Sequence, residues 1–309
     1  MTTSDLRVAS TAHQDFLGRL PDWVSFGMVY RGPNDQSPMA GNASDSGVVL
    51  AAAYDALFGI EQTVDPRWVK CEADTARERV QGACRSLGIV ALTAPRPDHG
   101  TGSIVEAGDH QRANFVNLAH CRSTADAVIF TPSIANEAFG TYAVGSLVAP
   151  ADCVVVNLVF AEKSGGRMGT RGIAQIHAGW DGLEKDVIAV TMKKAQAQGL
   201  DPRRALAYLA PHAGPSYTVY GAVAERFVRR TEFAEHMQPV EGLPGRYTLN
   251  MGAIATQQLV ACGVDPSAII IDPTDTLIDP RFPSHRNRVG KMPHIAPSRF
   301  GVILGMRAS

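Results

Sequence analysis

The sequence predicts an α+β fold, in which strand pairs and helices are mixed along the chain without a repeat. Short apolar runs rich in valine and isoleucine follow one another with glycine-rich turns between them, which is typical of strands. Longer segments carry apolar residues at helical spacing. The chain has 29 glycines and 19 prolines but only 19% charged residues, so its composition indicates a loop-rich globule with much buried surface.

The chain shows no linker that would divide it. Residues 1–20 are polar and are predicted to form a flexible N-terminal arm. The remainder, residues 21–309, is predicted to be a single domain.

The first half mixes strands and helices. Aromatic and β-branched residues predict a strand over 23–30, which ends at the turn-rich segment RGPNDQ. A helix is predicted over 44–60, where serine or aspartate can cap its start. Residues 77–89 have the pattern of an amphipathic helix, and residues 90–95 that of a short strand.

The second half begins with a run of strands and continues with helices. Strands are predicted at 127–131, 145–149, 153–161 and 172–178. The glycine-rich segment 164–172 is typical of a hairpin loop between the last two. Helices are then predicted over 183–199, 219–230 and 247–263, and late strands over 267–272 and 299–306.

A cysteine and a histidine lie at facing ends of the predicted hairpin. Cys153 begins one strand and His177 ends its partner, so an antiparallel pairing places them side by side. A thiol beside an imidazole can be half of a zinc site, a nucleophile with its base, or a pair of packed core residues. The segment HAGWDG, which follows the second strand, adds a strand-to-helix turn whose N–H groups can bind an anion.

These residues resemble the YfiH family, also called the laccase-domain or polyphenol-oxidase family. The resemblance rests on ADC (151–153) and HAGW (177–180), together with four flanking segments in the family's order. These are DHGTGSIVEAG (98–108), TADAVIF (124–130), LAPHAGPSYTVYGAVAERF (209–227) and DPRFPSHRNRVGKM (279–292).

The resemblance implies a layered α/β/β/α domain with one zinc ion per chain, held by His99, Cys153 and His177. Three protein ligands leave a fourth position for water or substrate, as in catalytic zinc sites. The family also implies phosphorolysis or deamination of purine nucleosides. Other members are assigned to peptidoglycan editing. An older label for the family describes copper-dependent oxidation of phenols.

This chain departs from the family pattern where an arginine is usual after HAGW. Asp181 occupies that position, and the early segment VSFGMVY also lacks the family's arginine. An aspartate repels an anion that an arginine would bind. Asp181 can instead act as a general base to zinc-bound water, or it can simply be a charge favoured at a helix N-terminus.

Four further residues form the predicted substrate-binding set. Trp180 and Tyr217 can supply an aromatic wall for a purine, and His212 and Arg286 lie in segments that resemble the family's motifs. For His212 and Arg286 a purely structural role is the alternative.

The sequence therefore predicts a zinc-dependent transferase or hydrolase acting on a nucleoside-like small molecule. One alternative is an amide hydrolase or biosynthetic tailoring enzyme on the same fold, using zinc or a Cys153/His177 pair. Another is a non-catalytic protein that binds a metal or small molecule. The nine histidines contain no His-x-His pair, which argues against a copper oxidase.

Charge and composition limit the partners and the compartment. The net charge of −1 supplies no overall field for nucleic acid. The apolar runs are too short to cross a membrane, and the first residues lack the pattern of a signal peptide. Five scattered cysteines favour a reducing, cytoplasmic environment. The sequence does not predict the oligomeric state.

Overall fold

The computed structural model describes most of the second half of the chain and separate segments of the first half. The described residues are 10–29, 80, 82–95, 97, 104–106, 125–132, 143–161, 170–279, 281–282, 284–286 and 300–307. The helix predicted over 44–60 and the predicted zinc ligand His99 lie outside these residues.

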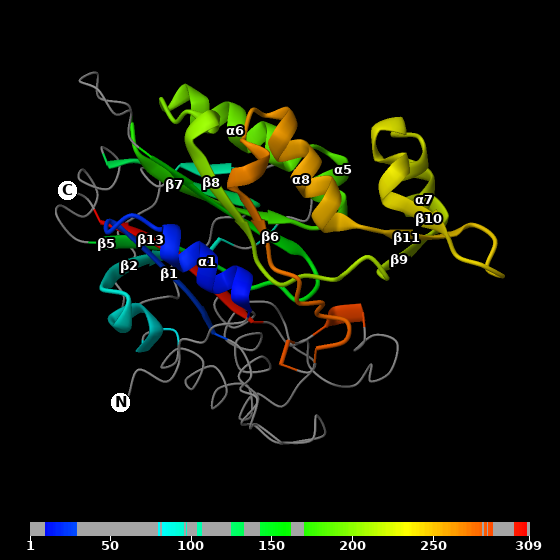
Figure 1. Cartoon of the computed structure of the whole chain (residues 1–309), viewed down its shortest axis with the longest axis horizontal. Coiled ribbons are helices and arrows are strands. Elements are labelled where there is room, and N and C mark those ends of the chain that lie inside the picture. The colour runs from blue at the N-terminus through cyan, green and yellow to red at the C-terminus, as the bar shows by residue number, and fades with distance from the viewer. Residues whose placement is uncertain are drawn as a thin grey trace.

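Two sheets form the centre of the described structure (Figure 1). Their strands are β1 (Val24–Val29), β2 (Ile89–Thr93), β3 (Ile104–Glu106), β4 (Ala127–Phe130), β5 (Ala143–Val148), β6 (Val154–Phe160), β7 (Gly172–Ala178), β8 (Ala205–Leu209), β12 (Ile269–Ile271) and β13 (Gly301–Arg307). The larger sheet has the order β12-β8-β6-β7-β4-β3, and the smaller has the order β1-β13-β5-β2. Mixed sheets with helices confirm the predicted α+β class.

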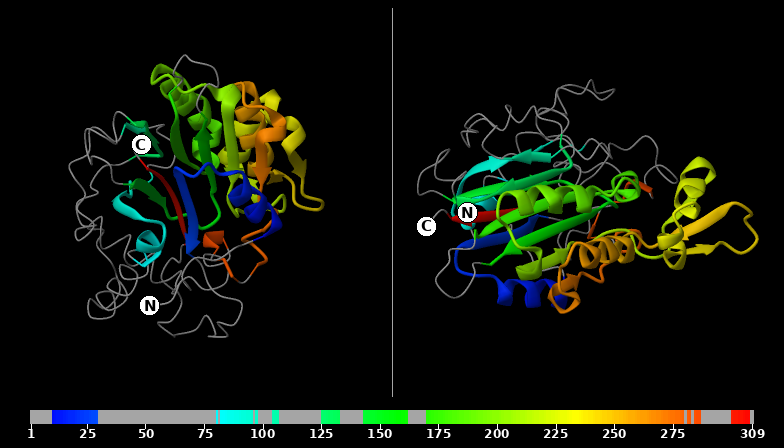
Figure 2. Two further views of the ribbon diagram at one scale, coloured as in Figure 1. Left: turned by 60° about the vertical axis from the view of Figure 1, so that its left-hand side comes forward. Right: turned by 90° about the horizontal axis from the view of Figure 1, so that it is seen from above.

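Helices cover the outer face of the larger sheet, and the smaller sheet packs on its inner face (Figure 2). The covering helices are α5 (Trp180–Glu184), α6 (Val187–Ala197) and α8 (Met251–Ala261). On the far side of the smaller sheet, the helical residues 82–86 pack through Cys84 against Leu92 and Ile303. The order of layers is therefore helix, sheet, sheet, helix.

Strand β6 is buried on both faces, which explains why its sequence is an almost unbroken apolar run. Val156 and Leu158 face the helices, whereas Val155 and Val159 face the smaller sheet. The polar exception is Asn157, which lies in a buried hydrogen-bonded ladder between the sheets. Gln175 of β7 donates to Asn157 at 2.9 Å and accepts from Ser146 of β5 at 2.7 Å. Each buried polar group of this ladder is thus paired.

The predicted hairpin is confirmed. Strands β6 and β7 pair antiparallel from Val154 opposite Ala178 to Phe160 opposite Gly172. This register brings the start of β6 and the end of β7 to one edge of the larger sheet.

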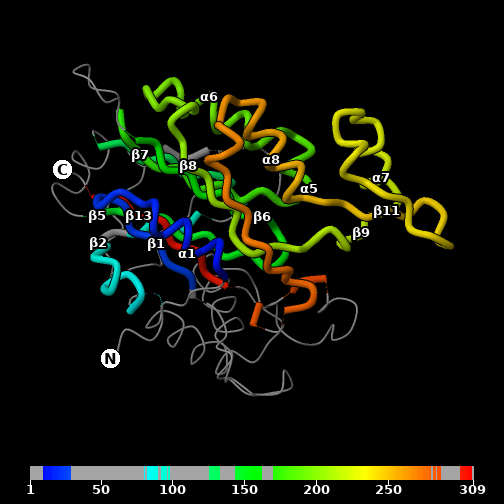
Figure 3. Tube along the Cα trace, viewed as in Figure 1, coloured from blue at the N-terminus to red at the C-terminus, as the bar shows by residue number. Residues whose placement is uncertain are grey.

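Residues 218–249 form a lobe that projects from the layered body (Figures 2 and 3). It contains β9 (Thr218–Tyr220), α7 (Gly221–Val228), the 3-10 helix η4 (Thr231–His236), β10 (Met237–Pro239) and β11 (Arg246–Leu249). Its strands form a small sheet of order β10-β11-β9. The chain leaves the body after β8 and returns through β11 into α8 (Figure 3).

Two of the helices predicted in this region begin later than their apolar patterns indicate. The predicted helix 219–230 begins only at Gly221, because residues 218–220 pair with β11. The predicted helix 247–263 begins at Met251. Asn250 caps it there by accepting a hydrogen bond from the Ala253 N–H at 3.0 Å. In both cases strand pairing across the lobe overrides local helix propensity.

The helix predicted over 183–199 is divided in two at Asp186. This residue has the left-handed conformation, with φ of 58°. Arg230 donates to its carboxylate at 2.9 Å and also to the Glu184 carbonyl. Gln258 of α8 donates to the same carboxylate at 3.0 Å. These contacts hold the break between α5 and α6.

The predicted N-terminal arm is ordered over most of the residues that the structure describes. Residues Thr11–Arg19 form helix α1, whose N-cap Ser10 accepts from the His13 N–H. Phe16 is fully buried and stacks on Tyr208 of β8 at 4.7 Å between ring centroids. The arm prediction is therefore wrong for residues 11–19, because the aromatic contact of Phe16 outweighs the polar average of the segment.

Acid is expected to destabilise the protein through His13, which packs against Phe26 and Tyr208. Burial lowers the pKa of His13 to about 4, although the charge of Asp272 opposes the shift. The unfolded chain binds this proton near pH 6.5 and the folded protein only near pH 4. The free energy of unfolding therefore falls as the pH drops through this window, by about 3 kcal/mol in total.

Urea unfolding at several pH values between 4 and 7 measures this loss. The dependence of stability on pH should be shallower in His13→Gln than in the unchanged protein. The control His236→Gln, in the projecting lobe, should leave the dependence as it is. An equal dependence in all three proteins would contradict the assignment to His13.

None of the helices in the described part combines the length and apolar character needed to span a bilayer.

Candidate metal and substrate site

Cys153 and His177 meet at the edge where β6 begins and β7 ends. Cys153 directly precedes β6, and His177 lies opposite Val155. Both side chains pack on Gly179, where an added Cβ would lie 3.0 Å from Cys153 Sγ and 3.6 Å from His177 Cε1. The thiol and the imidazole also share a hydrogen bond. The structure thus brings the two residues of the predicted pair into contact.

Asp126 lies on the other side of the imidazole. Its carboxylate Oδ1 is 3.4 Å from His177 Nδ1, and its carbonyl accepts from the His177 N–H at 2.7 Å. Both side chains are buried. Burial lowers the pKa of His177, but Cys153 and Asp126 outweigh this effect and raise it to about 9. The three residues form a chain in the order Asp126, His177, Cys153.

This chain of residues fits a metal ion chemically. Thiolate sulfur and imidazole nitrogen are the donors that zinc and copper prefer. Because Nδ1 is directed at Asp126, Nε2 is the ring nitrogen that a metal would take, and the carboxylate would orient the ring from behind. No cluster of three or more metal-binding side chains occurs within the residues that the structure describes, and His99 lies outside them.

Asp152 ties two loops to the start of β6. Its carboxylate accepts from Thr276 Oγ1 at 3.0 Å and from the Arg286 N–H at 2.8 Å. The guanidinium of Arg286 then lies over the Tyr217 ring, 4.3 Å from its centroid. Burial raises the pKa of Tyr217, while the hydrogen bond from Arg286 lowers it. Asp152, the residue before Cys153, therefore holds the backbone of Arg286, whose guanidinium packs on Tyr217.

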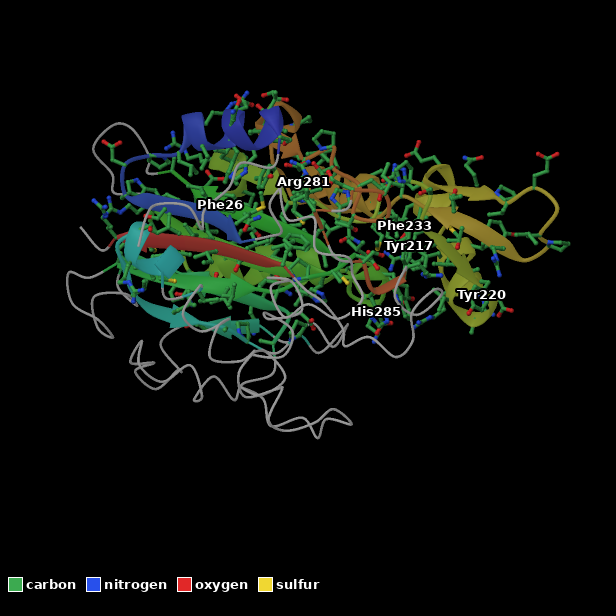
Figure 4. All side chains as sticks on the ribbon, turned by 90° about the horizontal axis from the view of Figure 1, so that it is seen from below. Phe26, Tyr217, Tyr220, Phe233, Arg281 and His285 are labelled. Carbon is green, nitrogen blue, oxygen red and sulfur yellow. The ribbon has the colours of Figure 1, made fainter. Side chains whose placement is uncertain are left out.

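A cavity of about 380 Å³ opens between the body and the projecting lobe. Figure 4 shows Tyr217 and His285 where the two parts meet, and Tyr220 further out on the lobe. Three of the four predicted substrate-binding residues line this cavity, namely Trp180, Tyr217 and Arg286. Its other lining residues are Val219, Tyr220, Val223 and His285. The volume and the aromatic walls suit a small, flat ligand.

His212, the fourth predicted substrate-binding residue, lies elsewhere. It is buried, and its Nδ1 is 2.8 Å from the Ala210 carbonyl oxygen. Its Nε2 faces Gly252 at the start of α8, where an added Cβ would lie only 2.3 Å away. Burial lowers the pKa of His212. These contacts favour the structural alternative, in which His212 packs the base of α8 against the body.

Asp181 is held by cations from two helices. Its carboxylate lies 3.0 Å from Arg226 of α7 and 2.9 Å from Lys185. Arg226 also stacks over Trp180, 5.0 Å from the ring centroid, and contacts Glu184 at 3.5 Å. The carboxylate thus links α5 to the projecting lobe, which favours a structural charge over a general base.

Asp181→Asn is therefore expected to lower kcat less than tenfold, because the carboxylate serves the ion pairs and not proton transfer. A general base would contribute about 10²–10⁴-fold. Steady-state rates on whichever substrate the protein turns over test this, with Glu184→Gln as the control that also weakens the contact to Arg226. A loss above a hundredfold in Asp181→Asn alone would restore the general-base role.

Sequence comparison shows which family the chain resembles. A family model described as multi-copper polyphenol oxidoreductase laccase matches residues 72–296. A purine nucleoside phosphorylase of Xylella fastidiosa (strain 9a5c) is 35% identical over 150 residues, which are 47% of this chain and 54% of that protein. A purine nucleoside phosphorylase of Haemophilus influenzae is 36% identical over 120 residues, 38% of this chain and 45% of that protein. The chain thus spans about half the length of these curated relatives.

Solved structures share the whole fold at low identity. Bacillus licheniformis hypothetical protein YfiH superposes with a TM-score of 0.68 at 16% identity, covering 98% of this chain and 100% of that one. YlmD from Geobacillus stearothermophilus gives a TM-score of 0.63 at 19% identity, covering 93% of each chain. These similarities establish the fold alone.

Proposed function

The chain belongs to the multi-copper polyphenol oxidoreductase laccase family, which includes the YfiH-like proteins, and we propose that it is a zinc-dependent enzyme acting on a nucleoside-like small molecule. The observation that carries this proposal is the contact of Cys153 with His177, oriented by Asp126, beside a cavity with aromatic walls. Relatives named purine nucleoside phosphorylase support the substrate class.

In this proposal Cys153 and His177 hold zinc, and His99 supplies the third ligand. Bound zinc supplies Lewis-acid chemistry, which polarises a substrate oxygen or lowers the pKa of water. Asp126 keeps the proton of His177 on Nδ1, so that Nε2 stays a ligand. Residues 21–309 form the single catalytic domain, and helix α1 packs on it. A cytoplasmic location stays a prediction.

The cavity residues bind and orient the substrate. Trp180 and Tyr217 offer their rings to a flat base. Arg286, placed by Asp152 and Tyr217, offers a guanidinium to an anion such as inorganic phosphate. With phosphate as the nucleophile, a phosphate oxygen bonds to C1′ of the ribose as the bond from C1′ to the base nitrogen breaks. The departing base takes up a proton.

A second candidate function is amide hydrolysis by Cys153 as nucleophile. The order Asp126, His177, Cys153 favours it, because a carboxylate, an imidazole and a thiol in hydrogen-bonded sequence form a nucleophile, its base and an orienting group. Metal binding and nucleophilic attack both need the thiolate. The two functions therefore exclude each other at this sulfur.

The deciding experiment is a substrate panel of adenosine, inosine, guanosine and methylthioadenosine, with and without phosphate. Release of free base only with phosphate, lost on chelation and restored by zinc, is the expected result. Release of ammonia from adenosine under the same metal dependence would indicate deamination. Activity on amides that survives chelators but not iodoacetamide would support the cysteine hydrolase. Zinc-loaded protein that turns over no nucleoside would contradict the proposal.

A further inference from the structure

Each tryptophan or tyrosine ring that lines the cavity carries an arginine guanidinium over one face. Arg226 lies over Trp180 at 5.0 Å and Arg286 lies over Tyr217 at 4.3 Å from the ring centroid. The third pair is Arg246 over Tyr220, at 5.3 Å. A guanidinium on one face fixes the ring and leaves the opposite face for a ligand.

Tyr220 differs from the other two rings in its exposure. Tyr217 is 8% exposed and Trp180 is partly buried, whereas Tyr220 is 60% exposed. An aromatic side chain exposed to this extent leaves apolar surface in contact with water. A large exposed aromatic at the wall of a cavity is the usual feature of a surface that a ligand covers.

The fold fixes the position of Tyr220. It ends β9 and lies directly opposite Arg246 of β11, so the stacked pair is built into the register of the lobe's sheet. Its backbone is extended, with φ of −152° and ψ of 169°. Gly221 then turns the chain into α7 with φ of 57°, a conformation that favours glycine. Strand pairing on one side and a tight turn on the other hold the ring at the cavity.

We infer that Tyr220 determines the specificity of this cavity, by stacking its ring, braced by Arg246, on the flat heteroaromatic ring of the ligand. Trp180 and Tyr217 form the aromatic wall on the body side, and Tyr220 is the aromatic ring that the projecting lobe contributes beside Val219 and Val223. The inference rests on the proposed function, because it assigns the ligand's base to this cavity. It adds that aromatic ligands are selected over non-aromatic ones through contact with the lobe.

The test is equilibrium binding of adenosine and of ribose 1-phosphate to the zinc-loaded full chain, measured by titration calorimetry. Stacking of a base on an aromatic residue is sequence-tolerant and accounts for about a tenfold to hundredfold change in affinity. Tyr220→Ala should lower the affinity for adenosine by that factor and change the affinity for ribose 1-phosphate by no more than about twofold. Tyr220→Phe should bind adenosine like the unchanged protein. Arg246→Ala should weaken it by a smaller factor.

Leu243→Ala is the matched control, because Leu243 is an exposed apolar residue of the same lobe that does not line the cavity. It should leave both affinities unchanged. If Tyr220→Ala binds adenosine as tightly as the unchanged protein, or loses both ligands equally, the inference is wrong while the proposed function stands. If the unchanged protein binds no nucleoside, both fall.

Discussion

Cys153→Ala is expected to abolish the proposed zinc binding and to lower kcat/KM at least about a thousandfold. The thiolate is one of the two proposed donors that the structure brings together, and alanine leaves His177 as the one proposed ligand among the described residues. Cys153 is partly exposed, so the substitution should cost little stability, about 1 kcal/mol at most. Metal analysis by mass spectrometry measures the zinc content, steady-state rates measure kcat/KM, and a melting curve measures the stability.

Cys262→Ala is the matched control, since Cys262 is also a partly exposed free cysteine and lies at the end of α8. It should keep one zinc per chain and full activity. Cys84 is a second cysteine with which Cys153 can be compared. Burial raises the pKa of Cys84 to about 12, so almost none of it is thiolate at neutral pH. An unchanged protein that carries no zinc, yet loses its activity when Cys153 is alkylated, would move the cysteine hydrolase into first place.

The hairpin and the proximity of Cys153 to His177 were predictable because they depend on local sequence. Two apolar runs joined by a glycine-rich loop define antiparallel strands, and the strand ends then fix which residues are neighbours. Trp180 follows for the same reason, since it begins the helix directly after His177. Residues close in sequence to a correctly predicted element were thus placed correctly.

Residues that reach the site through distant contacts were not predictable in this way. Asp126 approaches His177 only because β4 pairs with β7, and nothing near it in sequence specifies that pairing. Tyr220 lies in a segment with a helical pattern, but pairing with β11 extends its backbone. A sequence signal existed for Asp126, an acid directly before an apolar strand. Tyr220 can be identified only from its exposure and from its place in the cavity wall, both of which require the structure.

The same limit explains Asp181. Its sequence position, one turn from a proposed metal ligand, is compatible with both a general base and a helix charge. The deciding partner is Arg226, 45 residues away on the projecting lobe. An ion pair of that separation depends on how the lobe folds back on α5, which the local pattern of either segment does not encode.

Asp126→Asn is expected to weaken zinc binding about tenfold to a hundredfold while the protein stays folded. The backbone hydrogen bond from the His177 N–H to the carbonyl of residue 126 is unaffected by this change. The side chain, however, changes from an acceptor to a group that can donate. An amide N–H facing Nδ1 favours the tautomer with the proton on Nε2, and this nitrogen can then no longer bind the metal without losing it.

Competition with a chromophoric chelator measures the affinity, and Asp272→Asn is the control. Asp272 is a comparably buried carboxylate that accepts from Tyr208 and Ser10 at 2.6 Å each. It follows β12 at the same edge of the sheet, and β8 separates its strand from β6. That variant carries the cost of burying an amide in place of a carboxylate, so it should lose stability and keep its zinc affinity. If both variants bind zinc equally well, Asp126 does not orient His177. If Asp126→Asn loses activity in a protein that never held zinc, the same carboxylate orients the base of a cysteine nucleophile.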